Sequence, residues 1–183
     1  YLQLCSKVHL VSSRDKVLPG NDEDAAELIA KVFTDGGMQL LRNARAKRVT
    51  NTGSAVEVEL ADGQVLTGSH CLMAVGATPN TQGLNLEEAG IVLNETGHVV
   101  VNKVSRTSRA NVYAIGDCST SLPLASVSAM MGRTAVYHTL GDVASPTRLR
   151  NVASNVFTSP EIAQVGWSPS EIQEGLVRGE IAT

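Results

Sequence analysis

The segment 112–117, Val-Tyr-Ala-Ile-Gly-Asp, places the strongest constraint on how this chain folds. Its hydrophobic residues suit a buried strand, and that strand leads directly into a glycine and an acid. Gly116 lets the backbone approach a bulky ligand because it carries no Cβ. Asp117 offers two carboxylate oxygens to the hydroxyl groups of such a ligand. The alternative interpretation is a core strand followed by an aspartate that caps a loop.

A long helix is predicted to follow this segment, opened by Pro123 and closed by Gly141. The residues at its start are Pro123, Leu124, Ala125 and Ser126. The first N–H groups of a helix have no intrahelical acceptor and lie at the positive end of the helix dipole. They therefore suit an electron-rich or anionic group.

Hydrophobic periodicity and turn residues predict the remaining elements. Apolar residues at helical spacing follow an acidic start at Asp22, and Gly36-Gly37 ends that helix. The Asp62-Gly63 pair predicts a hairpin. The other predicted elements are strands at 7–12, 55–60, 65–67, 71–75, 97–101, 111–115, 152–157 and 162–165, and a short helix capped by Ser168 or Ser170.

Composition excludes several classes of function. The formal net charge is -3 and no long run of one sign occurs, which argues against a nucleic-acid partner. No stretch reaches about 18 consecutive apolar residues, so we expect no membrane span. Cys5, Cys71 and Cys118 are scattered and odd in number, which disfavours a disulfide framework or a metal site and favours a reducing cytoplasm.

Two further motifs accompany the first. Residues 73–81, Met-Ala-Val-Gly-Ala-Thr-Pro-Asn-Thr, form a second apolar segment that ends in a glycine and leads into a crossing. Residues 156–166, Val-Phe-Thr-Ser-Pro-Glu-Ile-Ala-Gln-Val-Gly, begin a third unit. In this order the three motifs resemble the pyridine nucleotide-disulfide oxidoreductase family, and the resemblance covers nearly the whole chain.

The resemblance implies an α/β fold: a partial flavoprotein with two Rossmann-like dinucleotide-binding domains, for FAD and NAD(P), and the start of an α+β dimerisation domain. Residues 1–77 correspond to the C-terminal part of the NAD(P)-binding domain. Residues 78–145 correspond to the C-terminal part of the FAD-binding domain, and residues 146–183 to the start of the dimer-interface domain.

The same resemblance assigns cofactor contacts. Asp117 and Gly116 are expected to contact FAD, and the backbone of 123–126 to lie along the flavin. Gly76 and Ala46 are expected near the nicotinamide dinucleotide. The family's glycine-rich loops, redox cysteine pair and C-terminal His-Glu segment do not occur here, so we assign no catalytic residue and expect an internal fragment of a longer enzyme.

The residues after the first strand bear on the choice of nicotinamide cofactor. Family members that prefer NAD carry an acid there, which binds both ribose hydroxyls. Here Ser12, Ser13 and Arg14 occupy this place, so no carboxylate repels a 2′-phosphate, and Arg14 or Lys16 is available to pair with one. We predict NADPH, or both NADPH and NADH, as the cofactor. The alternative is an ordinary solvated loop.

Two stretches, 105–107 and 122–127, resemble the lipoamide-dehydrogenase-like NAD(P)H:quinone reductases of mycobacteria and their relatives. This implies a homodimeric enzyme that passes hydride from NAD(P)H to FAD and on to a quinone or another small electron acceptor. The alternatives are a disulfide reductase such as lipoamide dehydrogenase and a truncated remnant that holds no flavin. Cys118 lacks a recognisable base or partner thiol, so we expect a small packing residue rather than a nucleophile.

Overall fold

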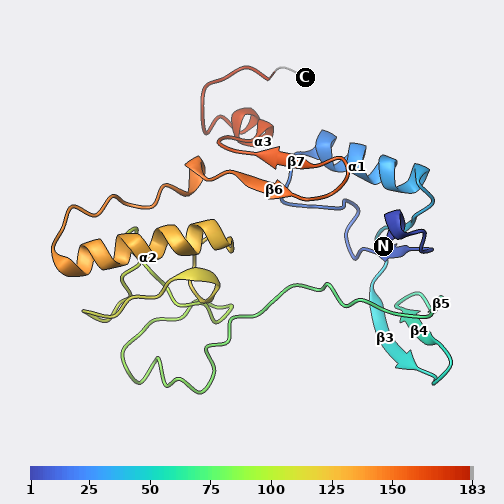
Figure 1. The fold of residues 1–183 in the computed structure, drawn as a ribbon, viewed down its shortest axis with the longest axis horizontal. Coiled ribbons are helices and arrows are strands. Elements are labelled where there is room, and N and C mark those ends of the chain that lie inside the picture. The colour runs from blue at the N-terminus through green and yellow to red at the C-terminus, as the bar shows by residue number, and fades with distance from the viewer. Residues whose placement is uncertain (182–183) are drawn as a thin grey trace. The chain divides into compact units, whose positions relative to one another are not determined.

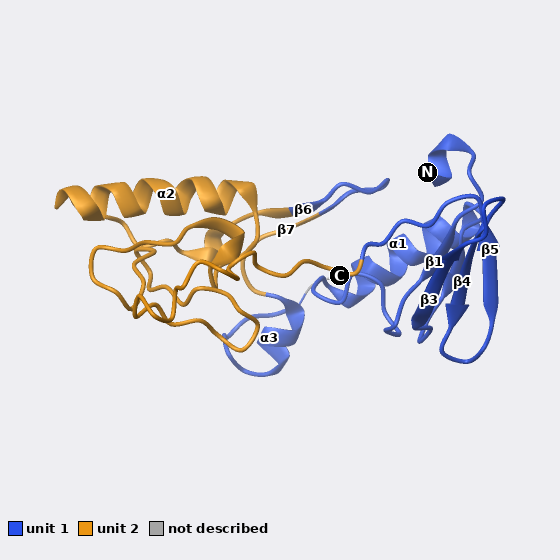
Figure 2. Cartoon of the chain, turned by 90° about the horizontal axis from the view of Figure 1, so that it is seen from below, with its two compact units in different colours: residues 1–74, 155–162, 168–183 blue, residues 75–154, 163–167 orange. Residues whose placement is uncertain are grey.

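The computed structural model describes residues 1–181 and divides them into two compact units. Unit 1 contains residues 1–74, 155–162 and those from 168 onward, and unit 2 contains residues 75–154 and 163–167 (Figure 2). Figure 1 follows the element order along the chain. The predicted domain boundaries at 77 and 145 stay predictions.

Unit 1 begins with a β-α-β arrangement. After a short 3-10 helix, η1 (Leu2–Leu4), strand β1 (His9–Val11) pairs in parallel with β2 (Gln39–Leu41), and α1 (Glu23–Asp35) connects them. Helix α1 buries Ala26, Ile29 and Ala30, whose spacing of three and four residues places them on one face. The predicted strand at 7–12 and the predicted helix after Asp22 are therefore confirmed.

An antiparallel meander follows. Strands β3 (Ala46–Asn51), β4 (Val56–Leu60) and β5 (Val65–Gly68) lie in the order β3-β4-β5. Gly63 has a φ of +90° in the turn between β4 and β5, as the Asp-Gly pair predicted. The register shifts between Ala46 and Arg48, where β3 starts.

The predicted strand at 71–75 is wrong. Its residues form no strand, and Leu72, Met73 and Val75 are 75%, 58% and 83% exposed. A buried parallel strand requires a neighbour to which its backbone can bond, and the parallel sheet that the structure describes consists of β1 and β2 alone. Cys71 is exposed with this segment, and Cys5 is exposed in a left-handed turn.

Unit 2 is built mainly from turns around one helix. The predicted strands at 97–101 and 111–115 contain only isolated bridges, Leu93 to Val99, Val99 to Ser119 and Arg106 to Tyr113. Helix α2 (Ala125–Leu140) begins two residues after Pro123 and ends at Gly141, which has a φ of +79°. Its Val127, Met131 and Ala135 are buried, whereas Val136 and Leu140 are exposed, so the buried side of the helix is narrow.

The last part of the chain contains short elements. A 3-10 helix, η3 (Leu149–Asn151), precedes β6 (Ser154–Val156) and β7 (Ile162–Gln164), which pair with each other. The Ser159-Pro160 peptide bond between the two strands is cis. Helix α3 (Pro169–Gln173) starts at Ser168, whose hydroxyl and backbone N–H form a capping box with Glu171. Of the two predicted caps, Ser168 is the observed one.

Candidate functional site

The predicted Gly-Asp motif forms a tight turn that is fixed from inside unit 2. The 3-10 helix η2 (Gly116–Cys118) begins after Ile115, and Gly116 has a φ of +78°. The Gly116 carbonyl accepts hydrogen bonds from the Ser119 backbone N–H at 3.0 Å and from the Ser119 hydroxyl at 2.7 Å. Ser119 is 1% exposed, so this anchor is buried. The turn thereby holds Asp117 at the surface.

Gly116 also permits a close approach between this turn and α2. A Cβ at this position would lie 3.2 Å from Ser128 Oγ and 3.6 Å from Ser128 Cβ. Since φ is positive and the neighbouring side chain is near, a larger residue here would be strained and would displace Ser128. The glycine is therefore required by the packing of η2 against α2.

The Asp117 carboxylate is exposed and accepts no hydrogen bond from any residue in the part of the chain that the structure describes. The alternative role, an aspartate that caps its own loop, requires such a bond. The backbone carbonyl of Gly116 and the Ser119 side chain close the turn instead. Asp117 is consequently free to accept hydrogen bonds from a ligand.

Helix α2 begins without a cap of its own. Its N-cap residue, Leu124, has no side chain able to accept a hydrogen bond, and the first turn contains no acid. The N–H groups of Ala125, Ser126 and Val127 have no acceptor among residues 1–181. Pro123, Ala125 and Ser126 are exposed. Free donors and the positive dipole end thus lie on the element that packs against η2.

These groups match what a flavin nucleotide presents. A carboxylate acceptor suits the hydroxyl groups of a ribityl chain, and unpaired amide donors suit an electron-rich ring edge. Gly116 contributes indirectly, because its missing side chain lets the turn that carries Asp117 pack against Ser128 of α2. The donor and acceptor set in unit 2 is therefore chemically compatible with FAD.

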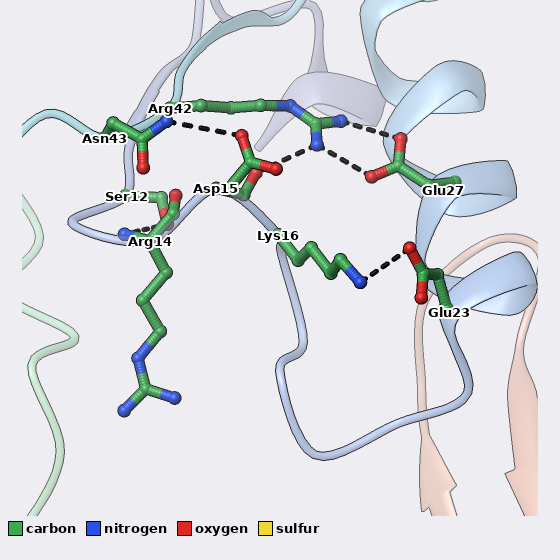
Figure 3. Close-up of polar contacts among 8 residues, drawn as sticks. All are labelled: Ser12, Arg14, Asp15, Lys16, Glu23, Glu27, Arg42 and Asn43. Carbon is green, nitrogen blue, oxygen red and sulfur yellow. Dashed lines mark hydrogen bonds and ion pairs between the residues drawn. The ribbon is translucent and has the colours of Figure 1, made fainter. Parts of the chain in front are cut away.

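The predicted dinucleotide residues Ser12, Ser13 and Arg14 follow β1 directly in unit 1. Figure 3 shows Ser12 and Arg14 in this loop. Ser12 Oγ accepts a hydrogen bond from the Arg14 N–H at 3.2 Å and donates one to the Arg14 carbonyl at 3.0 Å. Asn43 Nδ2 donates to Asp15 Oδ1 at 3.2 Å. Lys16 forms an ion pair with Glu23 at 2.5 Å. The loop is thus held by a set of local polar contacts.

Arg42 and Glu27 form the most extensive ion pair beside this loop. Arg42 donates from both terminal nitrogens to the two carboxylate oxygens of Glu27, at 2.7 and 2.9 Å, and also to the Asp15 carbonyl at 2.8 Å. The hydrogen bonds from Arg42 lower the pKa of Glu27 below its ordinary value. The same contacts raise the pKa of Arg42. This pair connects α1 to the end of β2 and to the loop.

The other two predicted contacts occupy different units. Gly76 lies in unit 2, where it is exposed and has a φ of +97°, and a Cβ added to it would meet no heavy atom within 4 Å. Ala46 lies in unit 1, exposed at the irregular start of β3. Both positions leave backbone accessible to a ligand, and their assignment to the dinucleotide stays a prediction.

Sequence reasoning did not identify several residues that shape these sites. Ser119 hydrogen-bonds to the Gly116 carbonyl, and Ser128 of α2 lies against Gly116. Glu27 and Arg42 lie fifteen positions apart, so no short motif marks their ion pair. Cys118 is half-buried, and its thiol donates to the Ile115 carbonyl at 3.4 Å. A hollow of about 700 Å³ in unit 2 is lined by residues of 78–97 and contains none of the predicted site residues.

No helix among residues 1–181 combines the length and the apolar character that crossing a bilayer requires. The cysteines Cys5, Cys71 and Cys118 are all free.

Two relatives show what the sequence is similar to. The NAD(P)H dehydrogenase (quinone) of Mycobacterium tuberculosis is 50% identical over 177 residues, which cover 97% of this chain. The dihydrolipoyl dehydrogenase of Mycoplasma pneumoniae is 30% identical over 178 residues, which cover 95% of this chain. The chain spans 36% of the length of the first relative and 38% of the length of the second.

Solved structures show the same fold. The crystal structure of LpdA from Mycobacterium tuberculosis matches with a TM-score of 0.91 and 50% identity over 97% of this chain and 39% of that one. The HOCl-induced flavoprotein disulfide reductase RclA from Escherichia coli matches with a TM-score of 0.82 and 32% identity over 92% of this chain and 39% of that one.

The comparison with protein families agrees with the sequence relatives and with the solved structures. The family model of the pyridine nucleotide-disulphide oxidoreductases matches residues 1–132, and this family consists of FAD-dependent oxidoreductases that use NAD(P)H. The α/β fold and the resemblance of the three sequence motifs are thereby confirmed. The chain belongs to the pyridine nucleotide-disulphide oxidoreductase family.

Proposed function

We propose that this chain forms part of an FAD-dependent oxidoreductase that takes electrons from NADPH or NADH and delivers them to a quinone-type acceptor. One observation carries the proposal: an unpaired carboxylate, Asp117, lies on a turn that packs against the uncapped start of α2. The quinone acceptor is supported by the 50% identity to a protein named NAD(P)H dehydrogenase (quinone).

Each part of the unit 2 site has a role in holding FAD. Asp117 accepts hydrogen bonds from the ribityl hydroxyls and fixes the position of the flavin along the turn. The backbone amides at the exposed start of α2, at Ala125 and Ser126, would donate to the electron-rich pyrimidine side of the flavin and stabilise negative charge there. When bound, FAD would supply the redox chemistry that connects NAD(P)H with the acceptor. The residues of this chain would bind FAD, orient its ring and stabilise negative charge on it.

The contacts with the nicotinamide dinucleotide are proposed for Ser12, Ser13 and Arg14 in the loop after β1, and for Gly76 and Ala46. The loop supports this role because it follows a parallel strand, which is where dinucleotide-binding α/β domains hold the adenosine ribose. The cytoplasmic location and the homodimer also stay predictions, the first from the scattered cysteines and the second from the family resemblance.

Disulfide reduction is the second candidate function. It is favoured by the 30% identity to a dihydrolipoyl dehydrogenase and by the similarity to a flavoprotein disulfide reductase. That chemistry requires a pair of redox thiols, and Cys5, Cys71 and Cys118 are separate free cysteines. A disulfide acceptor would therefore require thiols from outside residues 1–181.

A remnant without flavin is the remaining alternative. Large apolar side chains are exposed at Val75 (83%), Phe157 (82%) and Val143 (95%), and such exposure is unfavourable in an isolated soluble domain. This alternative predicts a colourless product that aggregates.

The experiment is purification of the complete polypeptide, followed by absorption spectroscopy and steady-state assays. We expect flavin absorption bands, and faster oxidation of NADPH or NADH with menadione than with lipoamide. Faster turnover with lipoamide than with menadione would favour disulfide reduction over quinone reduction. A folded product without flavin bands, and without gain of flavin after incubation with FAD, would reject an oxidoreductase role altogether.

A further inference from the structure

The segment that leads into the Gly-Asp turn lies along α2. A Cβ on Gly116 would lie 3.2 Å from Ser128 Oγ, near the start of the helix. A Cβ on Gly132 would lie 3.5 Å from Ile115 Cδ1, so the Ile115 side chain covers this glycine in the middle of the helix. One step back along the segment therefore corresponds to a step toward the C-terminus of α2.

A hydrogen bond joins the same segment to the other end of α2. The Tyr113 hydroxyl lies 2.6 Å from Nδ1 of His138, which is in the last turn of the helix. The two rings meet edge to face, with centroids 5.8 Å apart, and both residues are half-buried. Together with the contacts of Gly116 and Ile115, this bond places the segment antiparallel to α2.

The backbone of Tyr113 is anchored independently of α2. Tyr113 forms a bridge with Arg106, and the Ala114 N–H donates a hydrogen bond to the Ser105 carbonyl at 3.1 Å. Ser105 is 1% exposed, so this anchor belongs to the core of unit 2. The Tyr113 hydroxyl therefore extends from a backbone that is already held in place, and its bond to His138 joins that backbone to α2.

The three contacts differ in how strictly they define the position of the helix. Van der Waals contacts, such as that of Ile115 with Gly132, are non-directional and tolerate a small shift along the helix axis. A hydrogen bond weakens steeply when its distance or angle changes. Of these three contacts, the bond between Tyr113 and His138 therefore defines the position of α2 along the segment most strictly.

We propose that Tyr113 and His138 are a positioning pair for the flavin site, because their bond fixes α2 along the segment that carries Asp117. The inference rests on the proposed function, which places FAD between Asp117 and the start of α2. His138 comes ten residues after Ser128, roughly 15 Å along the helix, so the pair acts on the site through position and not through contact. Without the bond, α2 shifts in part of the molecules, and the affinity for FAD falls with the fraction that keeps the binding arrangement.

The test is a fluorescence titration of FAD into the apoprotein of the complete polypeptide. We expect Tyr113→Phe and His138→Leu each to weaken FAD binding about fivefold, the effect of one typical hydrogen bond. The double variant should bind FAD as well as either single variant, because both changes remove the same bond. His138→Asn should recover most of the affinity, since its side-chain amide can occupy the place of Nδ1.

Tyr137→Phe is the matched control, because it also removes a tyrosine hydroxyl. Tyr137 is an exposed residue of α2, and its hydroxyl forms no hydrogen bond among residues 1–181. We expect this variant to bind FAD as wild type does. Urea denaturation of each apoprotein measures the stability of the fold separately.

The outcomes separate a positioning role from a purely structural one. A lower urea midpoint in Tyr113→Phe with an unchanged FAD dissociation constant would overturn the inference and leave the proposed function intact. Multiplying effects in the double variant, or no recovery in His138→Asn relative to His138→Leu, would also overturn it. Failure of the wild-type apoprotein to bind FAD would overturn the proposed function together with the inference.

Discussion

The two long helices of this chain begin in different ways. Helix α1 is capped by its own sequence: Asp22 Oδ1 accepts a hydrogen bond from the Ala25 N–H at 3.2 Å, and Glu23 and Asp24 occupy the first turn. Helix α2 follows Leu124, which cannot cap it, and has no acid in its first turn. One helix thus has a side-chain acceptor at its N-terminus, and the other has none.

This difference in capping indicates which helix N-terminus is available for a ligand. The acids at the start of α1 already compensate the positive dipole end, and Glu23 also pairs with Lys16. At α2 no side chain performs this function, and an unpaired carboxylate lies on the adjacent turn. An uncapped helix of this length is less stable by itself, so a ligand that bonds to its amides would stabilise it.

The largest effect is expected when α2 is given a cap of its own. In Leu124→Asp, the new carboxylate would accept hydrogen bonds from the first-turn amides and place negative charge where the flavin ring is proposed to lie. We expect FAD affinity to fall about tenfold or more, which corresponds to roughly 1.4 kcal/mol. The measurement is a fluorescence titration of FAD into the apoprotein of the complete polypeptide.

Leu124→Ala is the matched control, because it removes the same leucine without adding an acceptor. Equal FAD affinities in the two variants would show that the free amides of α2 do not contribute to flavin binding.

Removal of the cap of α1 should lower the stability of the fold without changing flavin binding. Asp22→Ala removes the hydrogen bond to the Ala25 N–H, and loss of such a cap costs about 1 kcal/mol. Urea denaturation should detect this loss, while flavin occupancy stays at the wild-type level. Asp24→Ala, an exposed first-turn acid without a capping bond, should cost only a few tenths of a kcal/mol. A variant at Asp22 no less stable than one at Asp24 would contradict the capping role.

The smallest effect concerns the ion pair beside the unit 1 loop. Hydrogen bonds from Arg42 lower the pKa of Glu27 below its ordinary value of 4.5. The pair therefore stabilises the fold fully above about pH 4.5, and this stabilisation is lost as the pH falls through the lowered pKa. Glu27→Gln should slightly lower Tm at pH 7, and the difference from wild type should shrink in acid.

Glu57→Gln provides the comparison for this pH series, because Glu57 is an exposed acid that forms no ion pair among residues 1–181. If the two variants show the same dependence of Tm on pH, the Arg42–Glu27 pair does not contribute to acid stability.

Elements with local signals were predictable from the sequence. Asp22 and the glycines after Asp35 mark both ends of α1, and Gly141 marks the end of α2. The segment at 71–75 was predicted as a strand from its apolar residues, but a strand also requires a partner, and local composition does not specify one. The same reason explains why 97–101 contains bridges only.

The candidate site also combines features that local sequence predicts with features that depend on the folded chain. Gly116 and Asp117 are adjacent in the sequence, so the motif alone predicts that they contribute to the same site. The hydrogen bond that closes the turn comes from Ser119, and Ser128 of α2 lies against Gly116. Arg42 binds Glu27, fifteen positions earlier in the chain. These contacts depend on the folded chain, and so does the ion pair that joins Lys16 to Glu23.

The central claim is that the Asp117 carboxylate, next to the open end of α2, holds a flavin. The most direct measurement is the FAD dissociation constant of the complete polypeptide with Asp117→Ala, compared with Asp142→Ala, an exposed aspartate that follows α2. We predict that Asp117→Ala weakens FAD binding at least about tenfold, since hydrogen bonds to charged groups contribute about 1.5–3 kcal/mol, and that Asp142→Ala leaves it unchanged. Equal dissociation constants for wild type and both variants would contradict the claim.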